Sequence, residues 1–168
     1  MNEHKKIFRW FWVWNFDKEE QWLNSMAQEG WALNHVGLFL YDFVPCAPGE
    51  YTIRLEMRNP APEYLELMAE SGAEYVGRYT QWLYFRKRAD QGEFDLYSDL
   101  DSRMTHLQKV GRLLVLIGGL NLCIGLINTL NSFSFGWVNL VVASVLFYGL
   151  GRIHGKIDAL KEKRLLTE

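Results

Sequence analysis

Residues 113–130 read LLVLIGGLNLCIGLINTL, and they lie within thirty-nine residues between Arg112 and Arg152 that include no Asp, Glu, Lys or Arg. Eighteen helical residues extend roughly 27 Å, close to the hydrocarbon thickness of a bilayer. Residues 137–153 are predicted to form a second span, because the six residues in between allow only a tight reversal. The stretch therefore predicts a transmembrane helical hairpin, with a hairpin buried in a large soluble core as the alternative.

Basic residues flank both spans, whereas the turn between the spans carries no charge. Arg103, Lys109 and Arg112 precede the first span, and five Lys or Arg residues follow the second. Because short loops rich in Lys and Arg stay on the cytoplasmic side, both termini are expected in the cytoplasm, beneath the cell membrane.

Charge divides the chain into two parts. Residues 1–101 carry 10 basic and 17 acidic side chains, whereas residues 102–168 carry 8 basic and 3 acidic ones. The acidic part argues against nucleic acid as a partner, and the basic part suits anionic lipid headgroups. We expect a cytoplasmic α+β domain over 1–90, a connector and stalk helix over 91–112, the hairpin over 113–153 and a basic cytoplasmic tail over 154–168.

Periodicity predicts the elements of the first domain. Residues 7–16 alternate two apolar sets, which is typical of a strand covered on both faces. A helix that Asn15 or Asp17 caps is expected to end at Gly30, and residues 31–43 and 51–57 are expected to form paired strands. A second helix begins near residues 59–62 and ends at Gly72, before strands over 73–79 and 81–87. Ser98 or Asp99 is expected to cap the stalk helix.

The two halves of this domain resemble each other. Trp22-Leu23, Met26-Ala27 and Gly30 recur as Tyr64-Leu65, Met68-Ala69 and Gly72 at a constant offset. Each half reads as strand, helix, strand and a further strand. This internal repeat predicts a ferredoxin-like fold, in which one antiparallel sheet carries both helices on one face.

Several segments together resemble the family known as domain of unknown function 2812, over roughly residues 5–103. They are Phe11-Trp12-Val13-Trp14-Asn15-Phe16-Asp17, Trp22-Leu23, Met26-Ala27, Gly30-Trp31, residues 51–56 and residues 81–87. The resemblance implies a bacterial protein in which this domain precedes membrane helices, often encoded beside PadR-type transcriptional regulators. It thereby implies a role in signalling or envelope stress, and it supplies no catalytic residues.

The candidate binding site is the sheet face turned away from the helices. If Phe11, Val13, Ile53 and Leu55 pack under the helices, aromatic and charged side chains point the other way. The residues expected on this face are Trp10, Trp12, Trp14, Thr52, Arg54, Glu56, Trp82 and Tyr84. Indole rings beside a carboxylate suit an amphipathic or cationic small molecule, although a protein partner or the membrane could cover the same face.

Other classes of site find no support in the sequence. His4, His35, His106 and His154 are scattered, and neither Cys46 nor Cys123 has a partner at metal-ligand or disulfide spacing. No phosphate-binding glycine loop occurs. We therefore expect no metal, no cofactor and no enzymatic activity.

Small and polar residues recur within the spans. Gly111, Gly118 and Gly125 are spaced by seven, and Asn121, Asn128 and Asn139 could donate hydrogen bonds between helices. This pattern predicts close packing within the hairpin or in a homodimer. Two functions follow as hypotheses: a tethered sensor or interaction domain that acts on a regulator, and an assembly subunit of a membrane transporter.

Overall fold

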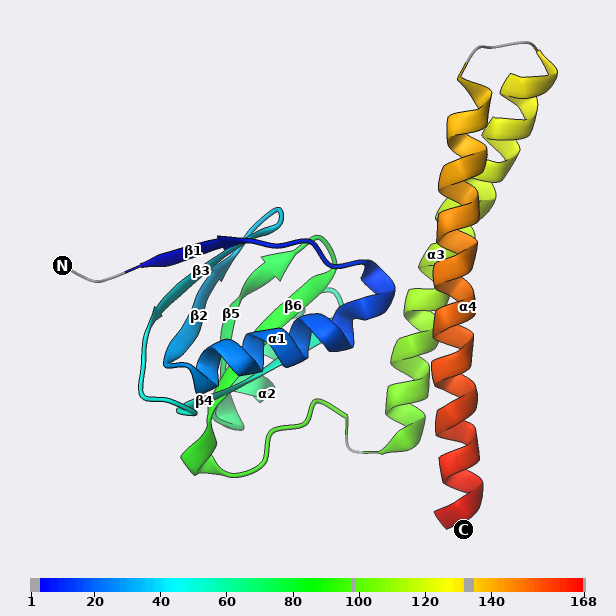
Figure 1. The fold of residues 1–168 in the computed structure, drawn as a ribbon. Coiled ribbons are helices and arrows are strands. Elements are labelled where there is room, and N and C mark those ends of the chain that lie inside the picture. Colours follow the sequence, from blue (N-terminus) through cyan, green and yellow to red (C-terminus); the bar gives the residue numbers. More distant parts are fainter. Residues whose placement is uncertain (1–3, 98, 132–134, 168) are drawn as a thin grey trace. The chain divides into compact units, whose positions relative to one another are not determined.

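A computed structural model describes residues 4–97, 99–131 and 135–167. The chain forms two compact units, residues 1–98 and 99–168, which we call the head domain and the helical hairpin. Their elements appear in Figure 1. In chain order these are β1 (Lys5–Phe8), η1 (Val13–Asn15), α1 (Phe16–Gln28), β2 (Trp31–Val36), β3 (Leu40–Pro45), β4 (Tyr51–Met57), α2 (Pro62–Glu70), β5 (Ala73–Tyr79), β6 (Trp82–Arg88), η2 (Ala89–Gln91), α3 (Leu100–Leu130) and α4 (Gly136–Thr167).

The head domain holds two antiparallel three-stranded sheets, ordered β1-β3-β2 and β4-β6-β5. The single antiparallel sheet expected from the sequence is therefore not formed. Contacts join β2 to β5, and the Arg86 guanidinium donates to the Leu33 carbonyl at 3.0 Å, but among the described residues no strand ladder connects the two sheets. The head domain is thus α+β, as expected, with a different sheet arrangement.

The long aromatic strand predicted over residues 7–16 is wrong. Strand β1 ends at Phe8, which pairs with Leu40, and one further backbone bond joins the Arg9 amide to the Phe39 carbonyl at 2.9 Å. Beyond this point β3 has no residue left to pair, because Phe39 adopts a positive φ of 57° and turns the chain into a hairpin. The chain then leaves the sheet and enters η1 and α1.

The single strand predicted over residues 31–43 is in fact the hairpin of β2 and β3. The Gly37 amide donates to the Leu40 carbonyl at 2.8 Å and closes its turn. Strand β4 consequently pairs with β6, over Tyr51↔Arg88 to Met57↔Trp82, and not with the preceding strand. Apolar residues on both sides of the turn had concealed this reversal.

The two helices of the head domain pack on opposite faces of the second sheet. Met68 of α2 packs with Leu83 and Phe85 of β6. Between these two residues Tyr84 points to the other face, where it donates to Glu19 of α1. The expectation that both helices cover one face of a single sheet is therefore wrong.

Side chains of α1 close the edge of the second sheet. The Asn24 amide donates to the Ile53 carbonyl and accepts from the Ile53 amide, both at 2.9 Å. The Glu20 carboxylate accepts from the Leu55 amide at 3.0 Å. These bonds satisfy backbone amide and carbonyl groups of the edge strand β4 that point away from its sheet. Without them, another chain could pair with these groups.

The two halves share several local features. Gly30 and Gly72 end α1 and α2 with φ values of 87° and 84°, in the region that favours glycine. In each half, an aromatic ring on the helix makes an edge-to-face contact with a phenylalanine. That phenylalanine lies on the third strand of the half, counted along the chain. The pairs are Trp22 with Phe43 and Tyr64 with Phe85, at 5.7 and 6.0 Å between ring centroids.

The connector belongs partly to the head domain, since Phe94 is buried beside Met68 and Phe85. The Asp99 side chain caps α3 by accepting from the Ser102 amide at 2.7 Å, as expected; Ser98, the alternative cap, lies outside the described residues. Stalk and first span form one continuous helix, α3. Helix α4 likewise includes the second predicted span and most of the predicted basic tail.

Helices α3 and α4 lie side by side along their length (Figure 1). Both are long and apolar enough to cross a membrane, and only 17% and 22% of their apolar windows are buried within the protein. A core helix of a soluble protein would be mostly buried. The two helices are thus compatible with a membrane hairpin.

Candidate functional site

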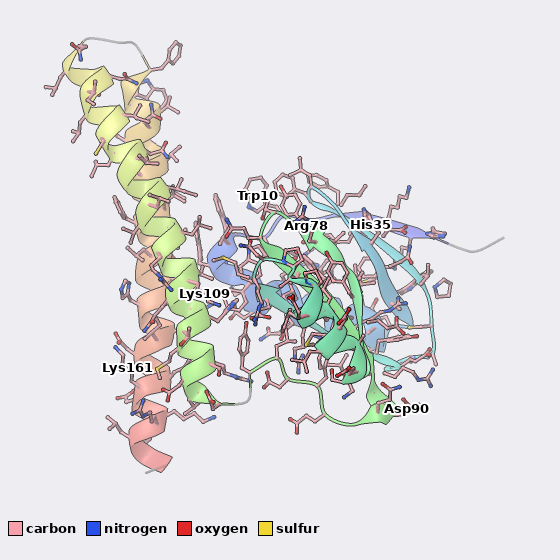
Figure 2. The ribbon with its side chains drawn as sticks, turned by 180° about the vertical axis from the view of Figure 1, so that it is seen from behind. Trp10, His35, Arg78, Asp90, Lys109 and Lys161 are labelled. Atoms are coloured by element: carbon pink, nitrogen blue, oxygen red, sulfur yellow. The ribbon has the colours of Figure 1, made fainter. Side chains whose placement is uncertain are left out.

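A patch of exposed apolar side chains lies where β1 ends and the β2–β3 hairpin turns. We call this set the aromatic patch; its exposed members are Phe8, Trp10, Trp12, Leu38 and Leu40, and the half-buried Phe39 packs against them. Phe8, Trp10 and Trp12 are 72%, 52% and 45% exposed, and Leu38 is 60% exposed. Figure 2 shows Trp10 and Arg78 at the same end of the head domain, away from Asp90. The patch is therefore a surface of one end of the domain.

Ring contacts hold the aromatic patch together. Trp10 stacks on Phe39 with centroids 4.3 Å apart and meets Trp12 edge to face at 5.3 Å. Trp12 in turn stacks on Trp14 at 4.9 Å, and Trp14 is buried. Three of the predicted site residues thus form a row that runs from the surface into the protein, although they do not lie on a sheet face.

The other predicted site residues lie elsewhere. Strand register places Tyr84 opposite Leu55 and Trp82 opposite Met57, so both aromatic residues share a buried face with apolar residues of β4. Arg54 and Glu56 point to the other face of the same sheet. The structure consequently does not assemble the mixed aromatic and charged face expected from the sequence.

Glu56 and Arg54 each have partners within the head domain. The Tyr64 hydroxyl donates to the Glu56 carboxylate at 2.5 Å, and the Arg58 guanidinium lies 3.6 Å from this carboxylate and over the Tyr64 ring. Burial raises the pKa of Tyr64, and the hydrogen bond to Glu56 and the negative charge of Glu56 raise it further. Arg54 pairs with Glu20 at 3.4 Å. Neither side chain therefore contributes to the aromatic patch.

A buried polar cluster joins α1 to both sheets, and sequence reasoning missed it. The hydroxyls of Tyr41 on β3 and Tyr84 on β6 both donate to Oε1 of Glu19, at 2.7 and 2.6 Å. Burial raises the pKa of Glu19, against the opposing effect of the two hydrogen bonds. Burial and the nearby carboxylate raise the pKa of both tyrosines. The sequence held one indication that Glu19 is buried: it precedes Leu23 and Met26 at the spacing of the apolar stripe of the helix.

This cluster is suited to a structural role. Its carboxylate and two phenols satisfy one another, so the cluster ties both sheets to α1. Among the residues that the structure describes, no group of three His, Cys, Asp or Glu side chains could hold a metal ion.

The regularly spaced glycines of α3 face α4. A Cβ atom at Gly111, Gly118 or Gly125 would lie 3.6, 3.2 or 2.6 Å from the nearest side-chain atom of α4. Of these three positions, Gly125 leaves the least room for a side chain. The Asn121 amide donates to the Ile117 carbonyl of its own helix at 2.9 Å rather than across the pair. Asn128 and Asn139 are partly buried.

Comparison with protein-family models gives a match, described as "Protein of unknown function (DUF2812)", over residues 15–118. The match begins just before α1, covers the rest of the head domain and continues past the middle of α3. Comparison with curated proteins and with solved structures gives no match. Because the family model covers more than half of the sequence, the chain belongs to the DUF2812 family.

Proposed function

We propose that this protein is a membrane-anchored, non-enzymatic interaction domain of a bacterial cell. In this proposal α3 and α4 cross the bilayer, and the aromatic patch of the head domain binds a partner protein. The observation that carries the proposal is the exposure of five large apolar side chains at one end of a domain that otherwise buries its core. They are Phe8, Trp10, Trp12, Leu38 and Leu40.

Exposure of this kind is unfavourable unless a partner covers it. Burial of one large apolar side chain contributes about 1.5–3 kcal/mol, and tryptophans are enriched among the residues that dominate binding energy. The stacking of Trp10 on Phe39 fixes the ring before binding, which lowers the entropic cost of association. Together these features favour a specific contact.

The chemistry of the patch favours a protein over a cationic small molecule. A carboxylate beside the rings would add charge attraction for a cationic ligand, but the carboxylate expected there, Glu56, is buried in another part of the domain. Two basic residues lie close by: Arg9, which precedes Trp10 in the chain and lies over the Phe11 and Trp22 rings, and Arg78, which is exposed at the same end. We therefore propose a partner that presents an apolar segment flanked by acidic residues.

The proposed location rests on the hairpin. Its two helices have the length and composition to cross a bilayer, and the basic residues lie at the end that is remote from the link between them. This charge distribution supports cytoplasmic termini and a cytoplasmic head domain. The family resemblance implies genes beside PadR-type regulators, and we therefore propose a transcriptional regulator as the partner.

Site-specific photocrosslinking in membranes from the expressing cell tests the proposal. A photoreactive amino acid replaces Leu38, and adducts are compared between the parent and a variant that also carries Trp10→Ala and Trp12→Ala. We expect one dominant protein adduct that the double substitution reduces about 30-fold, if each tryptophan contributes about 1 kcal/mol. The matched control is Leu67→Ala, which removes an equally exposed apolar side chain from α2.

An adduct that survives the tryptophan substitutions, or that Leu67→Ala weakens equally, would rule out the patch as the binding surface. The same membranes are washed with alkaline carbonate. We expect the protein to remain in the membrane fraction, since only embedded helices resist this treatment. Release into the wash would show that the hairpin does not span the bilayer.

A second candidate is an assembly subunit of a membrane transporter, because α3 and α4 leave most of their apolar surface unburied by each other. In that case a large residue on the outer surface of the hairpin, such as Gly119→Leu, disrupts the complex, and the tryptophan variant does not. A Cβ at Gly119 meets nothing within 4 Å, so this substitution leaves the hairpin itself intact. A homodimer would show crosslinks between identical chains.

We also propose that the head domain is a duplicated βαββ unit related to ferredoxin-like folds. The support is the shared strand order, in which the third strand lies between the first and second in each sheet. The paired positions of Trp22 with Phe43 and Tyr64 with Phe85 add to this support. A solved structure in which the halves fail to superpose would contradict the duplication.

A further inference from the structure

A band of basic residues surrounds the hairpin at the end remote from residues 131–136. A Cβ at Gly111 would lie 3.6 Å from both Leu150 and Ile153, so these parts of α3 and α4 lie at one level. Within about a turn and a half of that level the two helices carry Lys109, Arg112, Arg152 and Lys156. No Asp or Glu occurs between Asp101 and Asp158. The band is therefore basic, and Asp101 on α3 and Asp158 on α4 are the acidic residues that border it.

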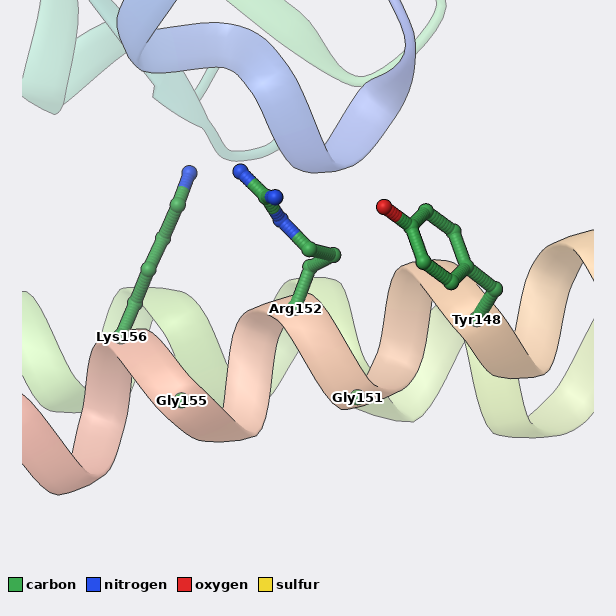
Figure 3. A pocket seen from close by; sticks show the side chains of 5 residues that line it. All are labelled: Tyr148, Gly151, Arg152, Gly155 and Lys156. Atoms are coloured by element: carbon green, nitrogen blue, oxygen red, sulfur yellow. The ribbon is translucent and has the colours of Figure 1, made fainter.

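One face of α4 in this band forms a small hollow. Tyr148, Arg152 and Lys156 are spaced by four, and Figure 3 shows their side chains projecting from the same side of the helix. Gly151 and Gly155 lie between them, and a Cβ at either position would meet nothing within 4 Å. Helix backbone thus forms the floor of the hollow, and a phenol, a guanidinium and an ammonium group form its walls.

These groups suit a phosphate ester. Arginine binds phosphate oxygens through two parallel hydrogen bonds, lysine adds a compact positive charge, and a tyrosine hydroxyl is a further donor. The open glycine floor lets a ligand approach the helix closely. No acidic side chain of the same helix segment repels an anion there.

The position of the hollow indicates where the phosphate comes from. Arg152 is the first charged residue after thirty-nine uncharged ones, so it lies where the proposed membrane span ends. We propose that this hollow binds the headgroup phosphate of an anionic phospholipid, with the phosphate between Arg152 and Lys156 and an acyl chain along Tyr148 toward the span. The inference rests on the proposed membrane anchoring, and it adds a specific lipid site to it.

Native mass spectrometry of the full-length protein in detergent micelles tests this site. Phosphatidylglycerol, phosphatidylcholine or inorganic phosphate is added, and the bound fraction is measured. We expect one phosphatidylglycerol molecule to bind in preference to phosphatidylcholine. The double variant Arg152→Gln, Lys156→Gln is expected to bind it about 30-fold more weakly, at about 1 kcal/mol per cation.

Two further variants separate a site from general attraction. The double variant Lys161→Gln, Lys163→Gln removes the same charge one to two turns farther along α4. It should leave phosphatidylglycerol binding within about 3-fold of the parent, because Lys161 and Lys163 lie beyond the hollow. Gly155→Leu keeps every charge and fills the hollow, and it should weaken binding about as much as the double variant. Circular dichroism checks that each variant remains helical.

Each remaining outcome overturns the proposal. Equal losses of phosphatidylglycerol binding in the two double glutamine variants would indicate diffuse attraction to positive charge. Unchanged binding by Gly155→Leu would place the lipid elsewhere. Saturation of the site by inorganic phosphate without lipid would identify a site for a soluble phosphate compound. Release of the protein by alkaline carbonate contradicts the anchoring itself, whereas retention in the membrane without a phosphatidylglycerol preference contradicts only the lipid site.

Discussion

Replacement of Glu19 by Ala is expected to destabilise the head domain by about 2–6 kcal/mol, because a buried hydroxyl that loses its partner costs about 1–3 kcal/mol and two hydroxyls lose theirs. Tyr41 and Tyr84 both donate to the same carboxylate oxygen. A typical domain has only about 5–15 kcal/mol of stability, so this loss is readily measured. The variant Glu19→Gln retains an oxygen that accepts both bonds, and it should remain folded.

The two Glu19 variants also differ in their response to pH. Burial raises the pKa of Glu19 in the folded state above its value in the unfolded chain. The folded state therefore binds the proton more tightly, and the free energy of unfolding falls as pH rises from the ordinary glutamate pKa through the raised one. The side chain introduced by Glu19→Gln cannot titrate, so the free energy of unfolding of this variant should lack this decrease. At pH values above the raised pKa, its free energy of unfolding should exceed that of the parent.

Urea unfolding of the full-length protein in micelles measures both effects. Six of the seven tryptophans precede Asp99, so tryptophan emission reports mainly on the head domain. Glu29→Ala is the matched control, since Glu29 follows the same helix and is exposed; its effect should stay within about 0.5 kcal/mol. A Glu19→Ala variant as stable as this control, or a parent protein whose stability rises across the interval, would refute the role of the cluster.

Three further substitutions test the packing of the chain. Gly125→Leu should separate α3 from α4, because even a Cβ at this position would lie 2.6 Å from Leu140. The control is Gly119→Leu, since a Cβ at Gly119 meets nothing within 4 Å. Disulfide crosslinking of cysteines placed across the two helices should fail for Gly125→Leu and succeed for Gly119→Leu. Asn24→Ala should cost about 1–3 kcal/mol in urea, since it leaves the Ile53 amide and carbonyl without their partner, and a loss below that of an exposed-site alanine would contradict this edge contact. Asp99→Ala should cost about 0.5–2 kcal/mol by removing the α3 cap, seen as faster amide exchange at residues 100–103; unchanged exchange would show that the cap is dispensable.

The sequence was a reliable guide wherever a local signal decided the structure. Helices α1 and α2 end where Gly30 and Gly72 adopt a positive φ, and Pro62 begins α2. Strands β5 and β6 lie close to their predicted bounds, and Asp99 caps α3. Each of these features depends on a few neighbouring residues, so periodicity and composition were sufficient to find it.

The aromatic segment shows where local reasoning failed. Alternation over residues 7–16 predicted a strand, but a strand needs a partner, and β3 offers none beyond the Phe39 turn. The turn itself was hidden, because Leu38 and Phe39 lack the composition of a usual hairpin loop. Trp10 and Trp12 were thus found as exposed candidates, although on a surface loop rather than on a sheet.

Sequence alone determined the two-part organisation of the chain, its α+β class and the apolar helical pair, because burial of apolar surface and the reach of a helix follow from the order of residues. Only the tertiary structure decided which faces meet. It divided the strands between two sheets, placed α1 and α2 on opposite faces of the second, and buried Glu19 between Tyr41 and Tyr84. These outcomes depend on contacts between residues up to 65 positions apart, whose pairing is fixed by the joint packing of all elements and by no local pattern.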